Sequence, residues 1–220
     1  MKTPFAGDKK VGQSLFTPLE KKFVAAFVGK IPLWLETYHL TSMTIVWSLG
    51  AIFFGYLARN NIQWLWGTSI MIVGQYLTDL FDGAVGRMRN TGLIKWGYYM
   101  DHFLDYVFLC SLLIGYFFIV PEHFVYLSFA MLALYGAFMV NSFLVFAATN
   151  AFRIAVFFIG PTEIRLAFIL VNTLIIVFGN SYMSQLLPYV LVVSLIALIV
   201  VVYRTQKEIW QMDMEQKRKS

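Results

Sequence analysis

Six long apolar blocks dominate this chain of 220 residues and strongly restrict the folds that it can adopt. Each block supplies the roughly 20 residues that a membrane-spanning helix needs. Hydrophobic residues make up 59% of the chain and charged residues only 13%, whereas soluble domains carry about 25% charged residues. The alternating ten-residue segments of a membrane β-barrel are absent. The blocks cover residues 40–58, 62–86, 97–119, 123–149, 162–179 and 183–203.

A short amphipathic segment precedes these blocks, over residues 15–29. Thr17, Pro18 and Glu20 form a predicted capping box, with the threonine at the N-cap and the glutamate at the third helical position. Apolar side chains recur on one face at helical spacing, which is typical of a helix that lies in the membrane interface. These apolar residues are Phe16, Leu19, Phe23 and Phe27.

The sequence therefore predicts an all-α polytopic membrane protein with a single membrane domain spanning residues 1–220. An interfacial helix precedes a six-helix transmembrane bundle over residues 40–203, and residues 204–220 form a charged cytoplasmic tail. The one cysteine, Cys110, excludes a disulfide within the chain and a thiolate metal site.

The basic residues predict the orientation of this bundle. If the N-terminus is cytoplasmic and the chain crosses six times, Arg59 alone of the 17 lysines and arginines lies outside. Both termini are then cytoplasmic, in the inner membrane if the cell is bacterial or archaeal. The net charge of +5 is explained by topology and anionic lipid headgroups, so we predict no nucleic-acid partner.

Four aspartates interrupt the second and third blocks near their predicted cytoplasmic ends. Asp79 and Asp82 stand three residues apart, and Asp101 and Asp105 stand four apart, so each pair shares one helix face. Unpaired carboxylates are costly inside a membrane, and oxygen ligands alone favour Mg²⁺ or Mn²⁺, with Ca²⁺ as an alternative and zinc disfavoured. We predict a site for two metal ions that opens to the cytoplasm.

Small residues accompany these aspartates on the same faces. Gly83 and Gly86 follow Asp79 at helical spacing, and Gly97 precedes the second acidic pair by one turn. Arg87 lies one turn after Gly83, within reach of a phosphate oxygen. These features indicate a nucleotide or phosphate ligand against the helix backbone; the alternative is that the glycines only let helices pack closely.

The whole pattern resembles the signature of the CDP-alcohol phosphotransferases. It runs Asp79-x2-Asp82-Gly83-x2-Gly86-Arg87-x9-Gly97-x3-Asp101-x3-Asp105, with a glycine at position 86 where that family usually has alanine. The resemblance implies transfer of a substituted phosphate from a CDP-linked donor to an alcohol or lipid acceptor, with release of CMP, in phospholipid biosynthesis. It also implies a homodimer.

The same resemblance implies roles for individual residues. Asp79, Asp82 and Asp101 are expected to hold two divalent ions, and Asp105 to join the metal site and act as the catalytic base. The expected nucleotide-binding residues are Gly83, Gly86, Arg87 and Gly97.

The acceptor stays open at this point. Residues 160–163, Gly-Pro-Thr-Glu, resemble a motif of choline/ethanolamine-type members in which the glutamate lies near the acceptor. This favours diacylglycerol as acceptor, but Glu163 equally suits the start of a helix. Arg153 and Arg165 are candidates for binding a phosphate, which favours a small alcohol with CDP-diacylglycerol as donor, or else serve topology and headgroup contact.

A cation transporter or channel that uses the aspartates as an ion path is the alternative from another functional class. Transport sites lie near the membrane midplane on broken helices, whereas these carboxylates cluster near one membrane face, so the enzyme is favoured.

Overall fold

The structure is a computed structural model that describes residues 9–11, 15–149, 151–153 and 160–219, with the backbone alone at residues 9–11 and 151–153. The described chain is helical except for two short strands, β1 (Lys9–Val11) and β2 (Ala151–Arg153), which pair in parallel. The α-helices are α1 (Thr17–Phe27), α2 (Thr37–Ala58), α3 (Leu65–Arg89), α4 (Ile94–Phe117), α5 (Val125–Thr149), α6 (Pro161–Phe178) and α7 (Asn180–Lys219). Short 3₁₀ segments cover Val28–Lys30, Ile62–Trp64 and Glu122–Phe124.

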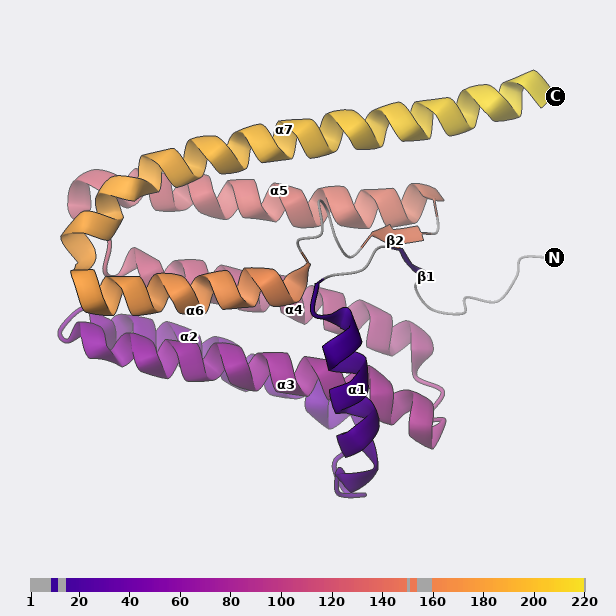
Figure 1. The fold of residues 1–220 in the computed structure, drawn as a ribbon, viewed down its shortest axis with the longest axis horizontal. Helices are drawn as coiled ribbons and strands as arrows, with labels where there is room; N and C mark the ends of the chain where they lie inside the picture. Colours follow the sequence, from indigo (N-terminus) through magenta and orange to yellow (C-terminus); the bar gives the residue numbers. More distant parts are fainter. Residues whose placement is uncertain (1–8, 12–14, 150, 154–159, 220) are drawn as a thin grey trace.

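Helices α2 to α7 run lengthwise beside one another, and α1 crosses them at one end (Figure 1). Because the connections alternate between the two ends, α3 finishes, and α4 and α6 begin, at the end where α1 lies. The C-terminal end of α7 also lies toward this end of the bundle. The two predicted acidic segments, at the end of α3 and the start of α4, therefore lie at the same end of the bundle, where α6 also begins.

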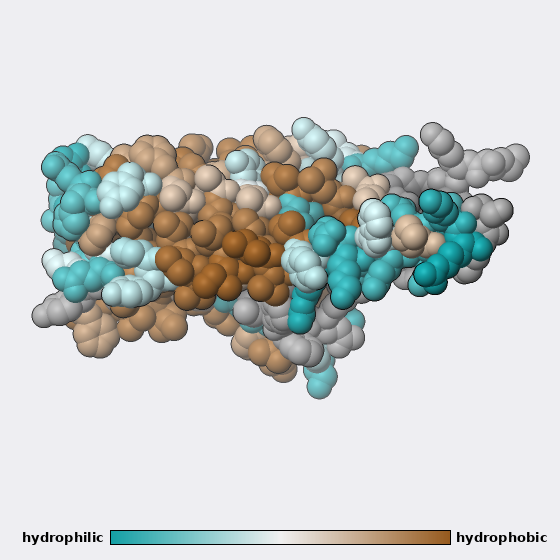
Figure 2. All heavy atoms as spheres, turned by 90° about the horizontal axis from the view of Figure 1, so that it is seen from above, coloured by the Kyte–Doolittle hydropathy of each residue, from teal (hydrophilic) through white to brown (hydrophobic). Residues whose placement is uncertain are grey.

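Within the described residues, five helical segments are long and apolar enough to cross a membrane. Helix α3 is not among these candidate spans. Its second half carries four charged residues, Asp79, Asp82, Arg87 and Arg89. Figure 2 shows apolar side chains in a broad central band of one face, with hydrophilic side chains toward both ends. These features fit an integral membrane protein. The five segments are Thr37–Ala58, Ile94–Phe117, Glu122–Thr149, Pro161–Phe178 and Ser184–Arg218.

Two glycines let α2 and α4 approach each other closely. A Cβ atom built on Gly55 would lie 2.4 Å from the Cα of Gly115, which is closer than real contacts allow. Small residues are the usual means by which membrane helices pack at short range. This crossing fixes α4, and with it Asp101 and Asp105, against the rest of the bundle.

The predicted start of α1 is wrong by one residue. Phe16, not Thr17, occupies the N-cap position. The Glu20 carboxylate bonds instead to side chains of two other helices: its Oε1 accepts hydrogen bonds from the hydroxyls of Tyr76 on α3 and Thr162 on α6. Tertiary partners that the local sequence does not reveal have thus replaced the local cap.

Candidate active site

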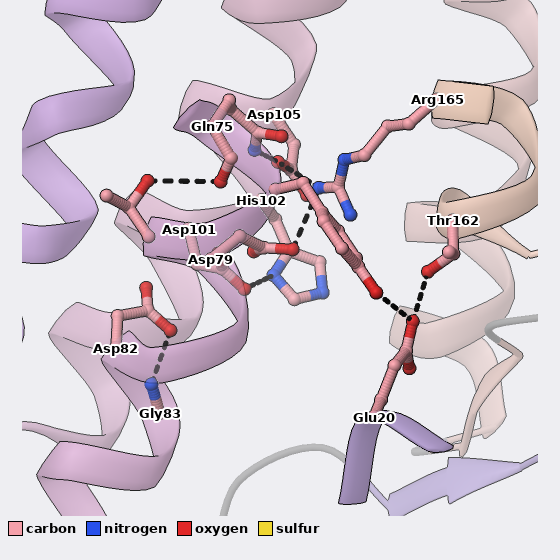
Figure 3. A network of polar contacts seen from close by, with 12 residues as sticks. Glu20, Gln75, Asp79, Asp82, Gly83, Asp101, His102, Asp105, Thr162 and Arg165 are labelled. Carbon is pink, nitrogen blue, oxygen red and sulfur yellow. Dashed lines mark hydrogen bonds and ion pairs between the residues drawn. The ribbon is translucent and has the colours of Figure 1, made fainter. Parts of the chain in front are cut away.

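Three of the four predicted aspartates meet in space. Asp79 comes from α3, and Asp101 and Asp105 come from successive turns of α4 (Figure 3). One carboxylate oxygen from each lies within 4.8 Å of the others. All three side chains are partly buried. The helical spacings explain this convergence, because residues three or four apart share a face.

Asp82 lies on the next turn of α3 and is 8% exposed. Its Oδ2 accepts a 2.7 Å hydrogen bond from the hydroxyl of Thr41 on α2, and its Oδ1 accepts one from the backbone N–H of Gly83. The hydroxyl of Thr37 donates to its backbone carbonyl. The structure therefore anchors Asp82 to α2 and leaves it outside the group of three.

Arg165, on α6, brings a positive charge to the cluster. Its Nη2 donates to Asp79 Oδ2 at 2.8 Å and lies 3.6 Å from Asp105 Oδ1. The side chain is 11% exposed, and its guanidinium also lies 5.6 Å from the ring centre of Tyr76. Arg165 is thus a member of the acidic site, where its charge partly offsets those of the carboxylates.

Two further contacts complete the surroundings of the carboxylates. Gln75 Nε2, one turn before Asp79, donates to Asp105 Oδ1 at 2.8 Å. His102 Nδ1 lies 3.4 Å from Asp101 Oδ2, and its ring contacts that of Tyr98 at 4.4 Å between centroids. Gln75 had no signal in the sequence beyond its helical spacing from Asp79.

The three predicted glycines have different surroundings. A Cβ on Gly83 would lie 3.2 Å from Nη1 of Arg87, so the guanidinium lies against this glycine. A Cβ on Gly86 would lie 3.0 Å from the Thr37 hydroxyl, which makes it a packing position against α2. Around Gly97, a Cβ would meet nothing within 4 Å.

Glu163, a predicted acceptor residue at the start of α6, contacts backbone N–H groups. Glu163 Oε2 accepts a hydrogen bond from the Gly160 N–H at 2.8 Å, and Oε1 accepts one from the Leu15 N–H at 2.9 Å. It therefore caps α6 and ties the segment before α1 to it. Arg153 lies on β2, where its side chain is outside the described part of the structure.

Arg89 carries a structural role that the sequence did not indicate beyond positive charge. Its guanidinium donates to the backbone carbonyls of residues 31, 32, 33 and 35 and forms a 3.5 Å ion pair with Glu36. It thus holds the segment that joins α1 to α2 against the end of α3.

The donor set fits a hard divalent cation. Asp79, Asp101 and Asp105 offer only oxygen atoms, and these lie close enough together to share one ion. Mg²⁺ and Mn²⁺ match such ligands, whereas zinc usually recruits histidine or cysteine.

A family model for CDP-alcohol phosphatidyltransferases matches residues 34–205, which contain every member of this cluster. The chain belongs to the CDP-alcohol phosphatidyltransferase family. No curated protein and no solved structure matches it. The protein is therefore an enzyme that transfers substituted phosphate groups in phospholipid synthesis. Enzymes of this family use divalent metals. The transporter or channel alternative is therefore not favoured.

Proposed function

We propose that this enzyme transfers a substituted phosphate from a CDP-linked donor to an alcohol and releases CMP. The observation that carries the proposal is the convergence of Asp79, Asp101 and Asp105, with ligand oxygens within 4.8 Å of one another, in a chain of this family. These three carboxylates would hold the divalent ions, Mg²⁺ or Mn²⁺. Asp82 would complete a site for two ions after its carboxylate leaves Thr41.

Bound there, the divalent ions supply Lewis-acid stabilisation of the negative charge on the diphosphate. Arg87, which lies over Gly83, is proposed to bind a diphosphate oxygen. Gly97, one turn before Asp101, has open space around its Cα, where the nucleotide can approach the helix backbone closely. Gly83 is proposed to bind the nucleotide together with the Arg87 side chain that covers it, and Gly86 contributes by letting α2 pack against α3.

Asp105 is proposed as the general base. The acceptor oxygen attacks the phosphorus that carries the substituent, and its proton moves to the Asp105 carboxylate. The phosphorus–oxygen bond to CMP breaks, and CMP leaves with the electron pair of that bond. The products are CMP and a phosphodiester, and Asp105 later returns its proton to water.

The position of Arg165 favours one acceptor class. Its guanidinium lies beside Asp79 and Asp105, where an anionic group on the acceptor would bind. We therefore favour a small alcohol that carries its own phosphate, with CDP-diacylglycerol as donor. Both Glu163 oxygens already accept backbone hydrogen bonds, which weakens the argument for diacylglycerol as acceptor.

We also propose that α3 is a sixth membrane crossing. Its 25 residues span about 38 Å at 1.5 Å per residue, and it runs beside the apolar helices of the bundle (Figure 1). With six crossings and the basic residues inside, the active site faces the cytoplasm. The homodimer stays a prediction from the family resemblance.

The decisive experiment gives purified enzyme a panel of labelled donors and acceptors with Mg²⁺ or Mn²⁺. CDP-diacylglycerol is paired with phosphorylated and unphosphorylated small alcohols, and CDP-choline and CDP-ethanolamine are paired with diacylglycerol. We expect CMP release that depends on both the metal and one acceptor. Absence of CMP release with every pair would contradict the proposed reaction, and release only with diacylglycerol would overturn the acceptor class.

A further inference from the structure

Gln75 is a buried amide at the edge of the acidic cluster. It lies on α3, one turn before Asp79, and only 1% of its surface is exposed. Although Asp79 is the nearer acidic residue along its own helix, Gln75 bonds across to Asp105 on α4, with 2.8 Å between Nε2 and Oδ1 (Figure 3). This is a link between helices, and it singles out one of the three carboxylates.

The chemistry of the pair fixes the orientation of the amide. An ionised carboxylate only accepts hydrogen bonds, so the nitrogen of Gln75 must face Asp105. Its Oε1 is then buried without a hydrogen-bond partner in the described structure. Leaving a buried acceptor unpaired costs about as much as a hydrogen bond to a charged group returns. Fold stability therefore gains little from a glutamine at this position.

The two contacts made by Asp105 fall on the same oxygen. Gln75 donates to Oδ1, and Nη2 of Arg165 lies 3.6 Å from that atom. Holding Oδ1 restricts rotation of the carboxylate, and Oδ2 is then the oxygen that can accept a proton. A base must hold its accepting oxygen within hydrogen-bond reach of the substrate hydroxyl.

We propose that Gln75 is a positioning residue, whose amide holds Asp105 Oδ1 so that Oδ2 meets the hydroxyl of the acceptor alcohol. The inference rests on the proposed function of Asp105 as base. Gln75 itself touches neither substrate nor metal and acts through Asp105 alone. Partners that orient a metal-ligating side chain commonly change metal affinity or activity by 10- to 100-fold when they are removed, so both quantities must be measured.

The test compares Gln75→Met with Gln75→His in the full-length enzyme. Methionine keeps the length and removes the donor, so we expect kcat to fall about 10- to 100-fold. The KM for the CDP-donor and the affinity for Mn²⁺ alone, measured by electron paramagnetic resonance, should change less than threefold. The melting temperature of the metal-free protein should be unchanged or higher. Histidine restores an N–H donor and should recover kcat to within tenfold of the parent enzyme.

Asn172→Leu is the matched control. Asn172 is a fully buried amide on α6 that bonds to Tyr116 and Ser69, away from the carboxylates. Its replacement should lower the melting temperature and leave kcat per folded molecule unchanged.

Three outcomes would overturn the inference: unchanged kcat in Gln75→Met, a loss of Mn²⁺ affinity that parallels the loss of kcat, or no recovery in a folded Gln75→His. If the parent enzyme itself releases no CMP, the proposed function has failed instead, and the two failures are thereby distinguished.

Discussion

Arg165 and Asp79 form the shortest ion pair of the cluster, at 2.8 Å. A charge inside a membrane protein is tolerated when it is paired, and this pair joins α6 to α3. Because Asp79 also offers one of the three clustered ligand oxygens, it has two roles, one in the fold and one in metal binding. The two roles can be separated by experiment.

Asp79→Ala should abolish the stabilisation of the purified protein by Mn²⁺. The substitution removes one of three ligand carboxylates, and metal sites lose affinity steeply when the ligand count falls. The measurement is the melting temperature with and without Mn²⁺. Asp213→Ala, at an exposed position of α7, is the control and should keep the full shift. An unchanged shift in Asp79→Ala would rule out the proposed metal ligands.

Asp105→Asn should lower metal-dependent CMP release by about 10²- to 10⁴-fold, the usual contribution of a general base. The amide keeps the size of the side chain but cannot accept the proton. Initial rates with the best donor and acceptor pair measure the effect, with Asp213→Asn as the control. Full activity in the Asp105 variant would show that another group is the base.

Residue spacing predicted the cluster because helical periodicity alone brings Asp101 and Asp105 onto one face. Spacing could not show that Asp82 bonds to Thr41 on α2, nor that Arg165 approaches from α6. Both outcomes depend on which helices are neighbours. Sequence patterns within one helix do not contain that information.

At the scale of elements, the crossing at Gly55 and Gly115 sets how closely α2 and α4 pack. Gly55→Ala should destabilise the protein by about 1–3 kcal/mol, the usual cost of overpacking, because the new methyl group meets backbone 2.4 Å away. Thermal unfolding in detergent measures the change. Activity should fall as well, since α4 carries Asp101 and Asp105.

Gly29→Ala is the matched control for this substitution. A Cβ at Gly29 meets nothing within 4 Å, so its melting temperature should match that of the parent protein. If the Gly55→Ala and Gly29→Ala variants have the same melting temperature, close packing at Gly55 does not hold α4 in place.

Helix bounds followed from the apolar blocks to within a few residues, except that α7 continues to Lys219 instead of ending near residue 203. The cap of α1 was also assigned wrongly. The predicted capping box assigned Glu20 to the first turn of its own helix. The structure instead uses its carboxylate to join α1 to Tyr76 and Thr162. A glutamate four residues into a helix satisfies either arrangement, and only the packing of α1 across the bundle decides between them.

At the scale of the whole molecule, one of the helices that build the active site, α3, is not among the candidate spans found by length and hydropathy in the described residues. The second half of α3 carries Asp79, Asp82, Arg87 and Arg89. Enzymatic function and a clear membrane signal compete for the same positions. The position of α3 within the bundle and the distribution of basic residues are the reasons to propose six crossings.

This topology makes a prediction about which side of the membrane each connection faces. In a Cys110→Ser background, Asn60→Cys places a thiol between α2 and α3, and Thr91→Cys places one between α3 and α4. A maleimide that cannot cross membranes should label Asn60→Cys in intact cells and Thr91→Cys only after the membrane is opened. The Cys110→Ser parent should stay unlabelled in both cases.

The two positions lie at opposite ends of α3, so their labelling reports directly on that helix. If α3 crosses the membrane, the two thiols must differ in access; if it lies on one side, they must behave alike. Labelling of Thr91→Cys from outside together with protection of Asn60→Cys would instead invert the whole bundle. The active site would then face away from the cytoplasm, where the CDP-linked donor is expected.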